Sequence, residues 1–177
     1  MHQLFPILVL ALCLSTVACK STKSVGDQAQ ATEQVDVSNP ELLALQQNPA
    51  DYPSNLALRL QRTSCFGNCP VYTTVVFADG TGIHFAKHHK TPEGTFSFKL
   101  SEKDLKLLLD KAASIGYFAL NDAYKKPVSD FPTTYTYVNN GKQRKQIENY
   151  RGAPEKLKEF EKLVDEVTVR APMNAVK

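Results

Sequence analysis

The residues best suited to chemistry are two cysteines, Cys65 and Cys69, which flank a Phe-Gly-Asn segment and precede Pro70. Two thiols at this spacing are compatible with a disulfide, a redox couple or a soft Cu(I) site. A redox pair is usually Cys-x-x-Cys at a helix N-terminus, where the helix dipole lowers the thiol pKa. Here the segment lies between two expected strands, which favours a structural disulfide and leaves copper or redox chemistry as the alternative.

A copper site would need a further ligand, and His84 and His88 are the candidates because residues at an even separation share one face of a strand. The surrounding segment is polar and contains Lys87 and Lys90, whose charges would oppose a bound cation. We therefore interpret these histidines as solvated residues at a strand end and predict no metal or other cofactor.

Acid–base catalysis would require two carboxylates that converge on a cleft. Glu93, Asp122 and Asp130 are loop carboxylates, a class more often found in turns than in active sites. The sequence contains no glycine-rich phosphate loop, no Ser-His-Asp spacing and no zinc signature. We expect a non-catalytic protein in which Asp130 pairs with Arg62 as a structural contact.

The N-terminus is typical of an exported protein. The apolar run from Leu4 to Leu14 is about half the roughly 20 residues of a membrane-spanning helix, so residues 1–18 are predicted to be a signal peptide. The segment Thr16-Val17-Ala18-Cys19 resembles a lipobox, which implies cleavage before Cys19 and attachment of lipid, including palmitate, to its thiol and new N-terminus. Residues 19–54 are predicted to be a flexible tether, polar through Asn39, with one or two helical turns expected near Pro40–Gln47.

An exported chain with this anchor is expected in the cell envelope. Lys20 follows the lipidated cysteine, and by resemblance to lipoprotein sorting this favours the outer membrane, facing the periplasm. The net charge is only +3, and the Lys and Arg residues are spread along the chain instead of forming the basic stripe that is typical of nucleic-acid binding. The expected partners are the membrane, reached through Cys19, and an envelope protein or small ligand.

Residues 55–170 are predicted to form one α+β domain, followed by a C-terminal tail at 171–177. Leu56, Leu58 and Leu60 alternate as on a strand with one face in the core. Asp79-Gly80 and Asn140-Gly141 are hairpin signals. The expected order is ββββ-α-ββ-α, a mostly antiparallel sheet of about six strands with both helices on one face. The expected strands lie near 56–61, 71–77, 83–85, 95–100, 135–138 and 144–150, and the helices run from Ser101 to Gly116 and onward from Pro154.

The segment Arg62-Thr63-x-Cys65-Phe66-Gly67-x-Cys69-Pro70-x-Tyr72 resembles the signature of a family of bacterial envelope lipoprotein domains of unknown function. The resemblance covers roughly Leu56 to Val169 and extends to Tyr124, Asp130 and Pro132. It implies the domain boundaries but no chemistry. The candidate surface residues are Arg62, Phe66, Tyr72, Tyr124 and Asp130.

Three functions remain open. The first is an envelope lipoprotein with a non-catalytic binding or structural domain. The second is a periplasmic copper-binding or thiol-redox protein that uses Cys65 and Cys69. The third is an inhibitor-like domain that presents the Cys65–Cys69 loop to an enzyme, since a rigid loop loses little entropy on binding.

Overall fold

The computed structural model describes residues 48–90 and 92–176. Within them the chain forms one eight-stranded sheet and two α-helices, an α+β fold as predicted. The elements are the 3₁₀ turn η1 (Pro49–Asp51), β1 (Leu56–Arg62), β2 (Val71–Phe77), β3 (Thr81–His88), β4 (Gly94–Lys99), α2 (Glu102–Ser114), the 3₁₀ turn η2 (Tyr117–Ala119), β5 (Ala123–Tyr124), β6 (Thr134–Asn139), β7 (Arg144–Asn149), α3 (Glu155–Arg170) and β8 (Asn174–Ala175). The expected signal peptide, Cys19 and most of the tether lie outside the described residues.

The strands lie in the order β5-β7-β6-β1-β2-β3-β4-β8, and every pair is antiparallel except β5 with β7. The prediction of about six strands was short by two, β5 and β8. Each of these has two residues, which is too few for an alternating pattern to be visible in the sequence. Both lie at the edges of the sheet, and β8 falls within the expected C-terminal tail.

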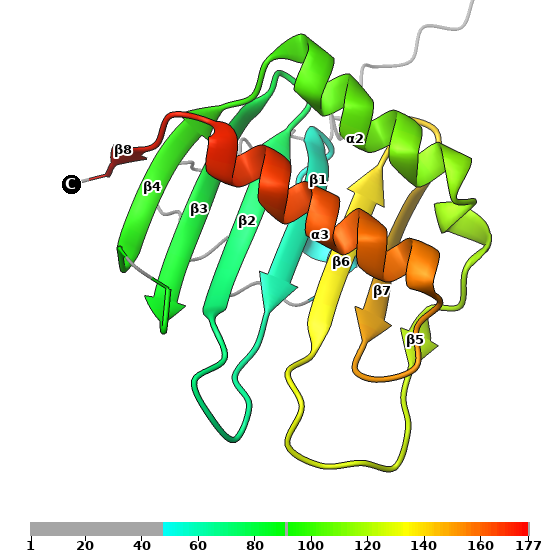
Figure 1. Ribbon diagram of the computed structural model, residues 1–177. Helices are drawn as coiled ribbons and strands as arrows, with labels where there is room; N and C mark the ends of the chain where they lie inside the picture. Colours follow the sequence, from blue (N-terminus) through cyan, green and yellow to red (C-terminus); the bar gives the residue numbers. More distant parts are fainter. Residues whose placement is uncertain (1–47, 91, 177) are drawn as a thin grey trace, which may run out of the picture. The chain divides into compact units, whose positions relative to one another are not determined.

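Both helices cover the same face of the sheet, and α3 crosses the central strands (Figure 1). The Ser101 hydroxyl accepts a hydrogen bond from the Asp104 amide and begins α2, and Gly116 ends it with a left-handed φ of 67°. The predicted stripe of α3, Leu157, Phe160, Val164 and Val167, is entirely buried. No helix within the described residues is both long and apolar enough to cross a membrane.

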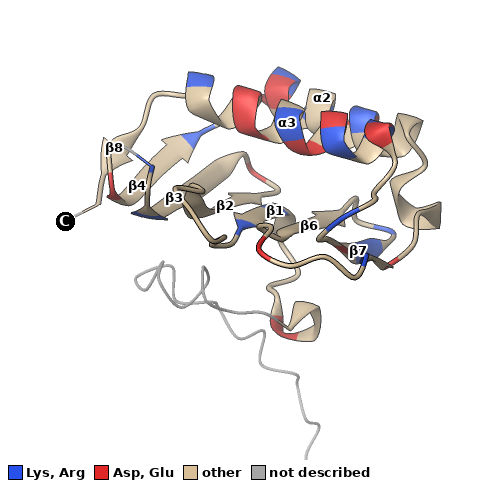
Figure 2. Cartoon of the chain, turned by 60° about the horizontal axis from the view of Figure 1, so that its bottom comes forward, with Lys and Arg blue, Asp and Glu red and all other residues tan. Residues whose placement is uncertain are grey.

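Charged residues of both signs are distributed along α2 and α3 (Figure 2). The face of the sheet that the helices cover carries the larger core, which includes Leu58, Leu60 and Val138. The opposite face carries a smaller cluster in which Tyr52 meets Tyr137 edge to ring at 4.9 Å.

Leu56 belongs to this smaller cluster, so the prediction that it shares a face with Leu58 and Leu60 was wrong. The pairing of β1 with β2 is irregular between Leu56 and Leu58. Such a bulge inserts one residue and reverses the alternation beyond it. Arg59, between the two inward leucines, is itself buried against Tyr52 on the opposite face.

Candidate functional site

Arg62, the last residue of β1, lies in a row of polar side chains on the face of the sheet that α3 covers. Arg62 lies opposite Tyr72 of β2 on one side and opposite Thr134 of β6 on the other. Neighbouring residues in a sheet point to the same face, so the three side chains form a continuous row. Asp165 of α3 lies above it. We call Arg62, Tyr72, Thr134 and Asp165 the buried network.

Hydrogen bonds join all four members of the buried network. The Arg62 guanidinium donates to Asp165 Oδ2 at 2.7 and 3.1 Å, to the Tyr72 hydroxyl at 2.8 Å and to Thr134 Oγ1 at 3.0 Å. The Tyr72 hydroxyl donates to Asp165 Oδ1 at 2.5 Å. Both Asp165 oxygens are therefore occupied, and this carboxylate is a structural partner rather than a free base.

The network is only partly shielded from water, since the Arg62 and Asp165 side chains are 27% and 26% exposed. Burial alone would lower the pKa of Arg62, but the charge of Asp165, the Tyr72 phenol and the hydrogen bonds to both together raise it overall. Burial also raises the pKa of the Tyr72 phenol well above its usual value, which keeps it a neutral donor to Asp165.

The expected pairing of Arg62 with Asp130 was wrong. Asp130 is an exposed residue with a φ of 71° in the loop before β6, whereas the partner of Arg62 comes from α3. One signal for Asp165 was present in the sequence, because it directly follows Val164 and flanks the apolar stripe of α3.

A second carboxylate, Glu161, lies one helical turn earlier on α3 and is buried, with 3% of its surface exposed. The Asn149 amide donates to its two oxygens at 3.1 and 3.0 Å, and the Thr136 hydroxyl donates at 3.4 Å. Burial raises the pKa of Glu161 to about 7, even though the hydrogen bond from Asn149 opposes the shift. Sequence reasoning missed this residue, which directly follows Phe160 of the stripe.

His84 lies in the next row of the sheet, opposite Thr74 of β2 and Phe96 of β4. It is only 4% exposed, so the expectation of a solvated histidine was wrong for this residue. Its Nδ1 lies 2.8 Å from the Thr74 hydroxyl. Burial and then the charge of Lys90 lower the pKa of His84 to about 4, so the imidazole is neutral at physiological pH.

His88 is exposed and does not share a face with His84, contrary to the prediction. It lies opposite Val71, whereas Ala86 lies opposite Tyr72, so β3 contains a bulge between the two histidines. Among the described residues no group of three or more His, Cys, Asp or Glu side chains could hold a metal ion.

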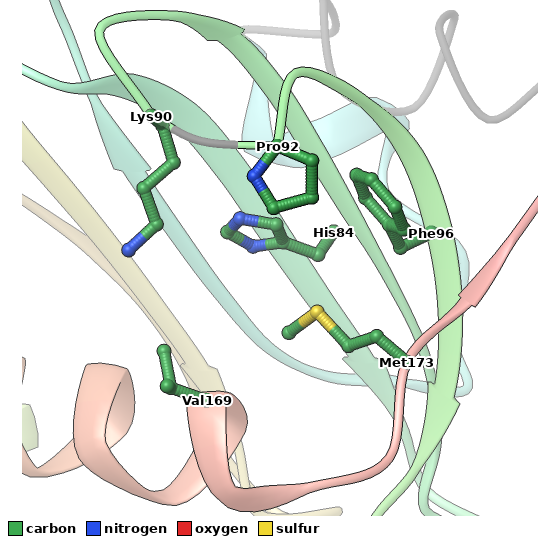
Figure 3. Close-up of a pocket in the computed structure, with 6 residues that line it drawn as sticks. All are labelled: His84, Lys90, Pro92, Phe96, Val169 and Met173. Carbon is green, nitrogen blue, oxygen red and sulfur yellow. The ribbon is translucent and has the colours of Figure 1, made fainter.

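A cavity with a volume of about 250 Å³, which we call the α3-end pocket, lies beside these rows. Figure 3 shows its six lining residues, which come from β3, β4, the connection between them, the end of α3 and the segment after it. They are His84, Lys90, Pro92, Phe96, Val169 and Met173.

The disulfide loop, residues 63–70, joins β1 to β2, and Cys65 and Cys69 form a disulfide within it. Thr63 holds its base, because the Thr63 amide donates to the Thr133 carbonyl at 3.0 Å and the Thr133 amide donates to Thr63 Oγ1 at 2.8 Å. Phe66, between the two cysteines, is 90% exposed.

The loop before β6 lies at the same end of the sheet as the disulfide loop (Figure 1). It carries two further exposed apolar residues, Val128 and Phe131. The Arg151 guanidinium stacks 4.1 Å from the Phe131 ring centroid, and the Tyr150 hydroxyl donates to the Val128 carbonyl. Both loops are therefore held by contacts outside their own turns.

The structure thus divides the five candidate surface residues. Arg62 and Tyr72 meet in the buried network, and Phe66 points to solvent. Tyr124 lies on the edge strand β5, where its hydroxyl accepts a hydrogen bond from the backbone N–H of Asn121 at 3.1 Å. Lys90, Thr74, Glu161 and Asp165 were not among the candidates.

Comparison with protein-family profiles matches residues 56–168 to the family described as "Domain of unknown function (DUF6438)". The match covers more than half of the chain and runs from the start of β1 to near the end of α3. Comparisons with curated proteins and with solved structures gave no significant match. The chain therefore belongs to the DUF6438 family of domains of unknown function.

Proposed function

We propose that this chain is a lipid-anchored protein of the cell envelope whose domain binds a partner protein, without catalysis, through the disulfide loop. One observation carries the proposal: Phe66 is 90% exposed at the centre of a loop that a disulfide closes. A large aromatic ring in water costs free energy that a partner can recover, and aromatic residues dominate binding hot spots.

The loop is also organised in advance of binding. The disulfide restricts the five residues from Cys65 to Cys69, and the Thr63–Thr133 hydrogen bonds fix its base. Little conformational entropy then remains to be lost when Phe66 enters a pocket. Val128 and Phe131 add apolar surface at the same end of the sheet, which would enlarge the apolar centre of such an interface.

The membrane anchor is supported by the lipobox-like segment that ends at Cys19. Mass spectrometry of the protein purified from bacterial membranes tests it. We expect an N-terminal peptide that begins at Cys19 and carries diacylglycerol, and a Cys19→Ser variant without that mass. Recovery of an unmodified Cys19 thiol would exclude the anchor.

Photo-crosslinking in intact cells tests the binding surface. We would place benzoylphenylalanine at position 66 of the full chain, and at Leu107, 43% exposed on α2, as the control. We expect one discrete adduct from position 66 that disappears when Cys65 and Cys69 are both replaced by serine. No adduct from position 66, or the same adduct from position 107, would contradict the proposal.

An inhibitor-like role is a narrower form of the same proposal, in which Phe66 enters the cleft of an enzyme. The exposed loop favours it because a protruding, cross-linked segment fits a concave site. If the crosslinked partner is a hydrolase, its turnover should fall on addition of the wild-type chain but not of the Phe66→Ala variant. Unchanged turnover with both chains would leave binding without inhibition.

A further inference from the structure

We propose that the α3-end pocket binds a small fatty carboxylate, with the carboxylate held by Lys90 and His84 and the hydrocarbon chain against the apolar walls. This site is separate from the disulfide loop, and nothing in the proposed protein-binding role requires it. The argument rests on the chemistry of the lining residues, the charges around them and the size of the cavity.

The pocket has an apolar part and a cationic part. Pro92, Phe96, Val169 and Met173 provide carbon and sulfur surfaces, whereas Lys90 and His84 are its two polar lining residues (Figure 3). Ligand pockets commonly have this composition, with a few polar groups that fix the orientation of a mainly apolar ligand.

Lys90 is held in place rather than free to extend into solvent. Its ammonium lies 5.1 Å from the centroid of the Tyr72 ring, a distance typical of a cation–π contact. Tyr72 is in turn fixed by Arg62 and Asp165. The buried network therefore fixes the Tyr72 ring, and this ring in turn holds the Lys90 ammonium at the pocket.

His84 supplies a second polar group. The Thr74 hydroxyl occupies its Nδ1, and within the described residues no hydrogen bond engages Nε2. When Thr74 donates to Nδ1, the proton lies on Nε2, which can then donate to a carboxylate oxygen. An anion in the pocket selects this tautomer, because the other one would direct a lone pair at it.

The surrounding charges favour an anion. Among the residues that the structure describes, no Asp or Glu lines the pocket. Asp165 is the acidic group whose charge raises the pKa of His84, and Arg62 pairs with it at 2.7 Å. Lys90 therefore provides the uncompensated charge at the site, and a carboxylate complements it.

The size and walls favour a short hydrocarbon chain over a peptide. The volume of about 250 Å³ lies below the roughly 300–1,000 Å³ of pockets for drug-sized ligands. Beyond Lys90 and His84 the lining side chains offer no hydrogen-bonding group for peptide amides, which would lose their partners in water. A medium-chain fatty acid is small enough for this volume and has no polar group along its hydrocarbon chain, so octanoate is a suitable probe.

The chain contains two methionines, Met1 and Met173, and Met173 lines the pocket, so methyl-labelled methionine provides a local reporter. We would titrate octanoate into the labelled full chain in lipid nanodiscs and follow the Met173 methyl signal by NMR. We expect a saturable shift with octanoate and at least tenfold weaker binding of neutral 1-octanol, because the alcohol lacks the charge-assisted contact with Lys90; a tenfold loss corresponds to about 1.4 kcal/mol.

Two matched pairs of variants locate the site. Lys90→Gln should weaken octanoate binding at least tenfold, whereas Lys87→Gln, at an exposed position near the end of β3, should change it less than twofold. Val169→Trp should fill the mouth of the pocket and abolish the shift, whereas Leu107→Trp on α2 should not; both positions are exposed, so folding is preserved.

Three results would overturn the proposal: a Met173 signal that does not move, equal affinity for octanoate and 1-octanol, or equal losses in the two lysine variants. Preferential binding of a peptide over octanoate would also overturn it. Crosslinking from position 66 is a separate measurement, so failure of the pocket and failure of the protein-binding role are distinguishable.

Discussion

The two ends of the 62–72 segment and its middle behave in opposite ways. Arg62 and Tyr72, at the ends, turn under α3 and exchange hydrogen bonds with Asp165, whereas Phe66, in the middle, is 90% exposed. The polar groups of Arg62 and Tyr72 find their hydrogen-bond partners within the domain, whereas the Phe66 ring is left in contact with solvent. A single sequence motif therefore combines a structural part with a part that is available to a partner. Substitutions at the ends should change stability, and substitutions in the middle should change binding.

The largest expected effect comes from breaking the buried network. Asp165→Ala leaves the Arg62 guanidinium without its carboxylate and should lower the free energy of unfolding by about 3 kcal/mol, the lower end for a buried pair because this one is a quarter exposed. Urea unfolding of the full chain measures it. Lys106→Met, which removes an exposed pair with Asp110, should cost less than about 0.5 kcal/mol. Equal losses in the two variants would show that the network is no stronger than a surface ion pair.

Glu161 should make stability depend on pH. Its pKa is about 7 in the folded protein and 4.5 as the ordinary value, so the folded state retains the proton longer. The resulting stability is fully present below pH 4.5 and is lost as the pH rises through 7. Glu161→Gln cannot ionise, and at pH 8 it should be about 3 kcal/mol more stable than wild type, because a difference of one pKa unit is worth about 1.4 kcal/mol.

The contribution of His84 to the pH dependence of stability must be separated from that of Glu161, because folding lowers the pKa of His84 and raises that of Glu161. A pKa of about 4, against 6.5 as the ordinary value, means that its contribution is present above pH 6.5 and lost as the pH falls through 4. The two effects oppose each other in the wild type between these limits. The difference in unfolding free energy between Glu161→Gln and wild type, measured from pH 5 to 8, isolates Glu161. A difference that stays constant across that range would contradict the assignment.

Removing the disulfide should affect both stability and binding. The double variant Cys65→Ser, Cys69→Ser should lose about 2 kcal/mol of unfolding free energy by the loop-closure relation, together with the crosslink from position 66. A thiol count by mass spectrometry should find neither cysteine free before reduction. Cysteines that reduce readily and take up Cu(I) would instead support the copper or redox alternative.

The smallest expected effect on stability is that of Phe66→Ala. The side chain is 90% exposed, so the unfolding free energy should change by less than about 0.5 kcal/mol. Partner binding should fall by at least tenfold, as for a hot-spot residue. A large loss of stability with binding preserved would reverse the roles of the middle and the ends of the segment.

Much of the fold could be predicted because its signals are local. The capping residue Ser101, the left-handed Gly116 and the stripe of α3 each act through neighbours within a few turns of chain. The edge strands β5 and β8 could not be predicted, because two residues are too few to show the alternation of apolar and polar side chains that marks a strand. The faces of Leu56 and His88 were also beyond prediction, since bulges interrupt the alternation on which such predictions depend.

The sequence by itself determined the α+β class, the order of the long elements, the hairpin turns and the cysteine pair in one short loop, because each depends on residues close together in the chain. Only the tertiary structure decided that Arg62 pairs with Asp165, 103 residues away, and that Glu161 and His84 are buried. It also decided that Lys90 lies beside an apolar cavity. The physical reason is that burial and ion pairing depend on which distant elements pack together, and α3 brings its carboxylates to the sheet only when the whole domain has folded.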